Sequence, residues 1–189
     1  MGGVPTLVVV DFQKAFDDPA YADPATRNNQ GAEKNVARLL EAWRARSAPV
    51  IHVHHYEDDP EWPMFNHGNP GFDFKDEAQP LPGEPVLEKN VNSAFIGTDL
   101  EKRLRDSAAT TVVVAGITTD HCASTTARMS GNLGFETWFV GDACATFPRE
   151  GPDGRTYDAD LIHRTALASL HGEFADVVST DEAIERLES

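Results

Sequence analysis

The chain has 189 residues, of which 40% are hydrophobic and 25% charged, a composition typical of a folded globular protein rather than a disordered one. Its formal charge of −15, from 31 acidic and 16 basic side chains, would repel phosphate backbones and anionic lipid surfaces. We therefore expect neither a nucleic-acid partner nor a membrane partner. No apolar run approaches the roughly 20 residues that a membrane-spanning helix needs.

Length and cysteine content predict a single cytoplasmic domain. A chain of this length can bury one continuous core, and we expect residues 1–189 to form one domain. The segment Met1–Pro5 has no basic region ahead of an apolar stretch, so no secretory signal is expected. The two cysteines, Cys122 and Cys144, are too few for a disulfide-stabilised scaffold and are expected to be reduced thiols.

The first half of the chain alternates between predicted strands and a helix. Residues 7–10 form an apolar run that ends at Asp11, as a buried parallel strand does. A helix follows, with apolar residues at helical spacing: Val36, Leu39, Leu40 and Trp43. Residues 49–54 are a predicted second strand, and residues 85–88 a short third one.

The stretch between the second and third strands, residues 57–84, is rich in proline, glycine, aspartate and aromatic residues. Connections this long inside a compact domain are usually functional lids or binding loops. Several aromatic side chains in it need something to pack against, which argues against disorder: Trp62, Phe65, Phe72 and Phe74. We interpret this segment as a candidate lid or oligomer contact.

The second half continues the alternation. Thr98 and Glu101 have the spacing of a capping box, which predicts a helix from there towards position 106. Residues 111–115 and 137–140 are predicted strands, each expected to stop at the glycine that follows, Gly116 and Gly141. Between them a helix is expected to begin near position 121 and to end by position 131 or 134.

The C-terminal region holds a helical face, a last strand and a last helix. Apolar residues at 162, 166 and 170 mark the helical face, and residues 174–178 are the predicted strand. Ser179 and Glu182 form a capping box for the final helix. Strands that alternate with helices imply right-handed crossovers and a parallel sheet covered on both faces.

Three chemically useful residues fall at the carboxyl ends of predicted strands, where parallel sheets bind ligands. Asp11 ends the first strand, Lys89 follows the third, and Cys122 follows the fourth after a short turn. Taken singly, each has an ordinary structural explanation. Together they place a carboxylate, an ammonium and a thiol in one crevice. We expect the helix N-terminus and Lys89 to favour the Cys122 thiolate, and Asp11 to act as the base. Cys144, in a purely apolar setting, is interpreted as structural.

Three segments in this order resemble the isochorismatase-like cysteine hydrolases. Residues 116–128 (GITTDHCASTTAR) resemble the family's nucleophile motif. Residues 8–16 (VVVDFQKAF) resemble its opening strand and aspartate, and residues 88–95 (EKNVNSAF) its lysine segment, followed by GTDL at 97–100. The resemblance spans most of the chain.

This resemblance implies a Rossmann-like three-layer α/β/α sandwich with a central, mainly parallel sheet, and a catalytic triad of Asp11, Lys89 and Cys122. It implies hydrolysis of a carbon–nitrogen bond of a small amide through a thioester. It also implies a cis peptide between Ile117 and Thr118, which would aim the Thr118 N–H, beside the Cys122 N–H, at a developing oxyanion. A homo-oligomer, dimer or tetramer, is expected from the same resemblance.

The pocket walls are expected to come from residues near the triad and from the long loop. The candidate substrate-binding residues are Gln13, Phe16, His55, Trp62, Phe65, Phe95 and Thr119. An apolar pocket with few polar anchors suits a small molecule. The acidic start of the loop favours a neutral or cationic substrate: Glu57, Asp58, Asp59 and Glu61.

Several histidines raise the question of a metal. Nicotinamidases, a branch of the family, carry Asp-x-His after the second strand, where this chain has His55-Tyr56-Glu57. We therefore expect no metal and no cofactor, and structural or substrate-contact roles for the histidines at 52, 54, 55, 67 and 121.

Alternative functions remain open. They are a ureido, carbamoyl or lactam hydrolase of the same family, a nicotinamidase, an isochorismatase-type vinyl-ether hydrolase, and a non-catalytic or redox thiol protein. A cysteine nucleophile favours amide over vinyl-ether chemistry, and the chain has no Cys-x-x-Cys spacing that would favour a redox pair.

Overall fold

A computed structural model describes residues 3–189, and its centre is a six-stranded sheet in the order β3-β2-β1-β4-β5-β8. All five neighbouring pairs are parallel. The strands are β1 (Thr6–Val10), β2 (Val50–His55), β3 (Val86–Lys89), β4 (Thr111–Ile117), β5 (Glu136–Ala145) and β8 (Asp176–Val178). The predicted central parallel sheet is confirmed.

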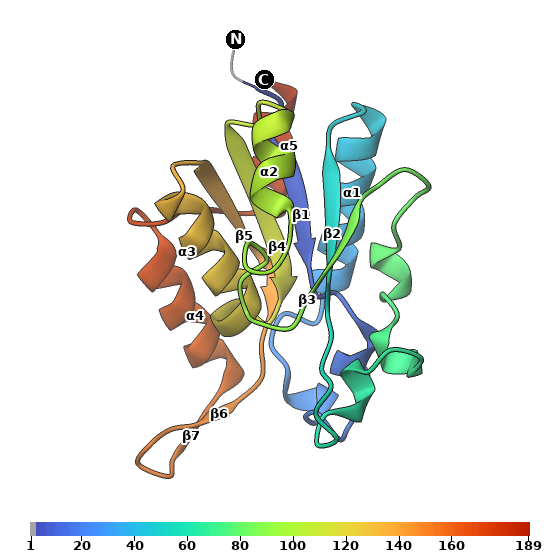
Figure 1. The fold of residues 1–189 in the computed structure, drawn as a ribbon. Helices are drawn as coiled ribbons and strands as arrows, with labels where there is room; N and C mark the ends of the chain where they lie inside the picture. Colours follow the sequence, from blue (N-terminus) through green and yellow to red (C-terminus); the bar gives the residue numbers. More distant parts are fainter. Residues whose placement is uncertain (1–2) are drawn as a thin grey trace.

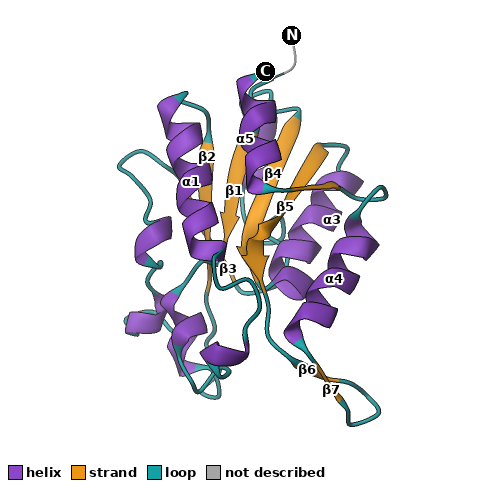
Figure 2. Cartoon of the chain, turned by 180° about the vertical axis from the view of Figure 1, so that it is seen from behind, coloured by secondary structure: helices purple, strands orange, loops and turns teal. Residues whose placement is uncertain are grey.

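Helices cover both faces of this sheet (Figures 1 and 2). One face carries α1 (Ala32–Ala45) and α5 (Thr180–Glu188), and the other carries α2 (Leu100–Asp106), α3 (Ser124–Asn132) and α4 (Ala159–Leu170). Side chains alternate along each strand. Leu7 and Val9 of β1 therefore join the core cluster under α1, while Val8 and Val10 join the cluster on the opposite face. This is the three-layer α/β/α sandwich expected from the sequence.

Two strands run past the glycines that were expected to stop them. β4 continues through Gly116 to Ile117, and β5 continues through Gly141 to Ala145. The register between them shifts near Gly116 and then resumes. A side chain at Gly116 would lie 2.5 Å from the Val10 carbonyl oxygen, so glycine here permits close approach of β1 rather than ending the strand. The last strand is shorter than predicted and begins at Asp176.

Of the two predicted capping boxes, one forms. Ser179 and Glu182 make the reciprocal hydrogen bonds of a capping box at the start of α5. The box predicted for Thr98 and Glu101 is wrong. The Thr98 hydroxyl instead donates to the Ala94 carbonyl and accepts from the Leu100 N–H. Residues 119–123 form a π-helical turn (η6), and so α3 starts at Ser124, a few residues later than expected.

The long segment 57–84 is packed against the sheet through short 3₁₀ turns. These are η3 (Pro63–Phe65), η4 (Pro70–Phe72) and η5 (Asp76–Ala78). The Phe74 ring stacks on His54 of β2 with 3.6 Å between centroids, and the Lys75 N–H donates to the Phe12 carbonyl. These contacts anchor its second half, and Met64 and Phe65 of its first half are buried in the core cluster under α1.

The remaining elements lie near the carboxyl ends of the strands. They are the 3₁₀ turns η1 (Lys14–Asp17) and η2 (Pro24–Thr26) and a small antiparallel hairpin of β6 (Arg149–Glu150) and β7 (Thr156–Tyr157). The hairpin projects from the body of the molecule (Figure 1). Within residues 3–189, no helix has the length and apolar character needed to cross a membrane.

Candidate active site

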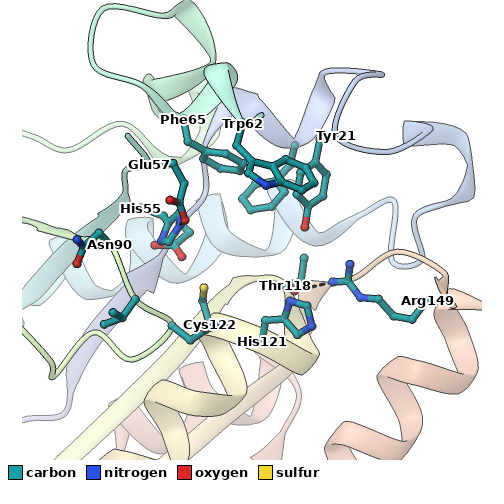
Figure 3. A pocket seen from close by; sticks show the side chains of 14 residues that line it. Tyr21, His55, Glu57, Trp62, Phe65, Asn90, Thr118, His121, Cys122 and Arg149 are labelled. Atoms are coloured by element: carbon teal, nitrogen blue, oxygen red, sulfur yellow. Dashed lines mark hydrogen bonds and ion pairs between the residues drawn. The ribbon is translucent and has the colours of Figure 1, made fainter. Parts of the chain in front are cut away.

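A cavity of about 330 Å³ opens at the carboxyl ends of the central strands, where a parallel sheet binds ligands. Four neighbouring strands each bring a polar residue to it or beneath it. Lys89 and His55 are the last residues of β3 and β2, Asp11 follows β1, and Thr118 follows β4. The lining residues, shown in Figure 3, are Asp11, Phe16, Tyr21, His55, Glu57, Trp62, Phe65, Asn90, Val91, Asn92, Thr118, His121, Cys122 and Arg149.

Asp11 and Lys89 form a buried ion pair at the base of this cavity. The Lys89 ammonium donates to Asp11 Oδ2 at 2.5 Å, and the two residues are 1% and 0% exposed. Asp11 has a φ of +54°, a left-handed conformation that aspartate tolerates better than most residues. Burial lowers the pKa of Lys89, but the Asp11 carboxylate and the Cys122 sulfur raise it by more, so the ammonium stays charged. The second Asp11 oxygen, Oδ1, is buried without a protein partner.

Cys122 lies in the π-helical turn, with its sulfur directed into the cavity (Figure 3). Its sulfur lies within 4.8 Å of an Asp11 oxygen and of a His55 ring nitrogen. Burial raises the pKa of the Cys122 thiol, the Asp11 carboxylate raises it further, and Lys89 offsets only part of this. The expectation of a resting thiolate is therefore wrong. The resting group is a neutral thiol, because a second anion beside Asp11 in a buried site is unfavourable.

The backbone around Cys122 turns sharply. The Ile117–Thr118 peptide is cis. The Thr118 carbonyl accepts hydrogen bonds from the backbone N–H groups of His121 and Ala123, on either side of Cys122. The Arg149 guanidinium stabilises the turn through two hydrogen bonds: it donates to the Thr118 hydroxyl at 3.1 Å and to the Asp120 carboxylate at 2.9 Å.

His55 and Glu57 extend the triad through hydrogen bonds. His55 Nδ1 lies 3.4 Å from the Lys89 ammonium, and His55 Nε2 lies 2.8 Å from the Glu57 carboxylate. Because an ammonium only donates, Nδ1 must accept and the ring proton belongs on Nε2. His55 is then neutral and donates to Glu57. A continuous series of hydrogen bonds therefore runs from Glu57 through the His55 ring to Lys89 and Asp11.

One group of potential metal ligands exists among residues 3–189: Asp11, His55 and Cys122. Its composition does not suit a divalent cation. The Lys89 ammonium contacts both Asp11 and His55, and its positive charge would repel the ion. Both His55 ring nitrogens are already engaged.

Aromatic rings form the wall of the cavity opposite the sulfur (Figure 3). Tyr21 contacts Trp62 and Phe65 with ring centroids 5.8 Å apart in both cases, and Phe16 contacts Tyr21 at 4.9 Å. Phe16, Trp62, Phe65 and His55 were all expected near the substrate and do line the cavity.

Three of the predicted substrate-contact residues do not line the cavity. The Gln13 amide is fully buried and bonds the backbone of His55 and Phe72. Phe95 belongs to the core cluster on the α2 face. The Thr119 hydroxyl is buried at 2.8 Å from His163 Nδ1. None of these three side chains lines the cavity, so the expectation that they contact the substrate is wrong.

The other histidines serve structure. His52 bonds the Glu84 carboxylate at 2.8 Å, His54 stacks on Phe74, and the exposed His67 pairs with Glu88. Only His55 and His121 line the cavity.

Sequence reasoning missed five of the cavity residues: Tyr21, Asn90, Val91, Asn92 and Arg149. Tyr21 lies in an irregular connection after β1, where no periodic pattern indicates direction. Arg149 follows the carboxyl end of β5, so the strand-end rule could have found it if the strand had been extended beyond Gly141 to Ala145.

Comparisons with known proteins agree with this architecture. Residues 5–182 match the isochorismatase domain family. An isochorismatase family protein of Bacillus subtilis, YrdC, is 46% identical over 94% of this chain and 93% of its own. The crystal structure of an isochorismatase-family protein from Chromobacterium violaceum superposes with a TM-score of 0.92 at 42% identity, covering 97% of this chain and 93% of that one. Maleamate amidohydrolase of Pseudomonas putida is 29% identical over 98% of this chain and 88% of its own. The chain therefore belongs to the isochorismatase family of hydrolases.

Proposed function

We propose that the protein is a cysteine hydrolase that cleaves the carbon–nitrogen bond of a small-molecule amide through a thioester on Cys122. The observation that carries the proposal is the meeting of three side chains at one cavity. Lys89 Nζ lies 2.5 Å from Asp11 Oδ2, and the Cys122 sulfur lies within 4.8 Å of an Asp11 oxygen. A relative over nearly the whole chain is named an amidohydrolase, which supports the same bond type.

In the first half-reaction, an Asp11 oxygen accepts the thiol proton as the sulfur attacks the amide carbon. The free Asp11 Oδ1, which has no protein partner, is available for this role. The backbone N–H groups of Thr118 and Cys122 hold the tetrahedral oxyanion. The C–N bond then breaks, Asp11 gives its proton to the leaving nitrogen, and a thioester remains.

In the second half-reaction, the same carboxylate takes a proton from water, and the hydroxide attacks the thioester carbon. The C–S bond breaks, the proton returns from Asp11 to the Cys122 sulfur, and the carboxylic acid product leaves. Lys89 supplies a fixed positive charge beside Asp11 and the sulfur throughout, which favours the transient thiolate.

The same chemistry accommodates ureido, carbamoyl and lactam substrates, because each presents a carbonyl carbon bonded to nitrogen. A panel of small amides, ureides and lactams, assayed for released ammonia or amine, tests the proposal. Cys122→Ala should abolish turnover, while Cys144→Ala, which alters the other buried thiol, should retain it. Acid-quenched mass spectra should show an acyl adduct on Cys122. Near-normal turnover by Cys122→Ala would falsify the scheme.

We also propose a cytoplasmic homo-oligomer. Cytoplasmic location is supported by two unpaired cysteines. Oligomerisation is supported by exposed apolar side chains: Trp62 and Val91, which line the cavity, are each 39% exposed, and Ile96 is 49% exposed. A partner subunit would cover them. Light scattering should give a mass of at least twice the 20.6 kDa chain, and Ile96→Glu should lower it. A monomer at micromolar concentration would contradict this.

A further inference from the structure

We propose that the amide substrate carries a cationic group, bound between the Glu57 carboxylate and the aromatic wall of the cavity. This inference rests on the proposed amide hydrolysis and narrows its substrate class. It begins with the formal charges that line the cavity, because an unbalanced charge there selects for the opposite charge on a ligand.

Most charged groups at the cavity are already neutralised by neighbours. Asp11 is paired with the Lys89 ammonium. Arg149 is paired with Asp120 at 2.9 Å, which leaves no net charge at that end. Burial lowers the pKa of His121, and the nearby Asp120 does not reverse this, so the ring is neutral at neutral pH.

Glu57 is the exception among the lining residues. Its only close partner is the ring of His55 at 2.8 Å, and that ring is neutral because its other nitrogen accepts from Lys89. The Glu57 side chain is 33% exposed, so its carboxylate remains open to a ligand. One uncompensated negative charge therefore faces the cavity.

The aromatic wall lies beside this carboxylate. Trp62, Phe65 and Tyr21 all line the same cavity, and Phe65 lies next to Glu57, whose backbone N–H donates to the Phe65 carbonyl at 3.3 Å (Figure 3). Aromatic faces attract cations, and a carboxylate next to them adds a direct charge partner. The same arrangement repels an anionic amide.

Long-range electrostatics act in the same direction. Three more acidic side chains follow Glu57 on the exposed part of the segment: Asp58, Asp59 and Glu61. With a formal charge of −15 on the chain, they would steer a cation towards the cavity and an anion away from it.

Three benzamides test the inference: meta-(aminomethyl)benzamide, its isostere meta-ethylbenzamide, and the larger, anionic meta-(carboxymethyl)benzamide. Ammonia release should give a kcat/KM at least about tenfold higher for the cation than for the neutral amide, with the anion lowest. Glu57→Gln should reduce the cation-to-neutral ratio towards one, and Glu57→Lys should place the anion above the cation. Glu185→Gln, which changes an exposed carboxylate of α5 outside both the cavity and the acidic segment, should leave the ratio unchanged.

Calorimetric binding to Cys122→Ala separates this inference from the proposed chemistry. Tighter binding of the cation, lost in the Cys122→Ala, Glu57→Gln double variant, supports it without any turnover. Equal binding of the cation and the neutral amide overturns it, as does equal kcat/KM. Ammonia release that persists in Cys122→Ala would instead overturn the thioester mechanism and leave the charge preference standing.

Discussion

Removing the Asp11 charge should make Cys122 more reactive towards alkylation while abolishing hydrolysis. Burial raises the pKa of the Cys122 thiol first, and the Asp11 carboxylate raises it further, whereas Lys89 lowers it. The sulfur and an Asp11 oxygen lie within 4.8 Å. At that distance, two unit charges in a medium of effective dielectric constant about 20 interact by about 3.5 kcal/mol. Since each pKa unit corresponds to about 1.4 kcal/mol, Asp11→Asn should lower the thiol pKa by about two to three units.

The assay is the rate of iodoacetamide modification, followed by intact mass in a Cys144→Ala background so that only Cys122 reacts. At a pH below the thiol pKa, the Asp11→Asn rate should rise by roughly tenfold to hundredfold. Lys89→Met should act in the opposite direction and slow alkylation, because it removes the one charge that favours the thiolate. Slower or unchanged alkylation of a folded Asp11→Asn protein would refute the electrostatic argument.

Other predictions concern stability and positioning. Burial lowers the pKa of His54 from an ordinary 6.5 to about 4, so the unfolded chain binds more protons between these values. The neutral ring thus contributes up to about 3 kcal/mol that is fully present above pH 6.5 and lost as the pH falls to 4. Urea unfolding should show a shallower slope in His54→Phe than in the wild type or in the His171→Gln control, where an exposed histidine is changed. The slope that remains comes from the other histidines whose pKa burial lowers: His52, His121 and His163. Gly116→Ala should cost about 1–3 kcal/mol, because its Cβ would lie 2.5 Å from a β1 carbonyl, whereas Gly31→Ala meets nothing within 4 Å and should not lower the urea midpoint. His55→Leu should lower kcat by about tenfold with little change in KM, because the ammonium loses an acceptor, and His55→Asn should restore part of it.

The sequence allowed the cluster at the cavity to be predicted because topology, not side-chain detail, brings its members together. Asp11, Lys89 and Cys122 follow strands whose apolar runs are unmistakable, and parallel strands place their carboxyl ends on one edge. This strand-end rule does not predict which way a side chain points once the chain has entered the following loop. Gln13, two residues after Asp11, was expected to contact substrate, yet its amide is used to hold the backbone of β2 and of the long segment.

Other features depended on contacts that no local pattern encodes. Gly116 and Gly141 look like strand ends in sequence, but both lie inside strands. The β1 backbone approaches Gly116 so closely that glycine is needed there, whereas a side chain at Gly141 would meet Leu167 of α4 at 3.2 Å. The charge balance of the cavity also could not be predicted from the sequence. Arg149, in the β6–β7 hairpin, forms an ion pair with Asp120. Because of this pairing, Glu57 is the lining carboxylate that has no charged partner.

The two cysteines show why thiol acidity alone does not identify a nucleophile. Burial raises the pKa of both Cys122 and Cys144, so neither is a thiolate at rest. Cys144 is 0% exposed and its sulfur only accepts a hydrogen bond from the Gly116 N–H. Cys122 differs in having a carboxylate within proton-transfer reach once a substrate closes the gap, an ammonium to balance the charge, and an opening to the cavity. In the proposed mechanism, reactivity would come from the base and from access to the cavity, because burial disfavours a free thiolate in the absence of substrate.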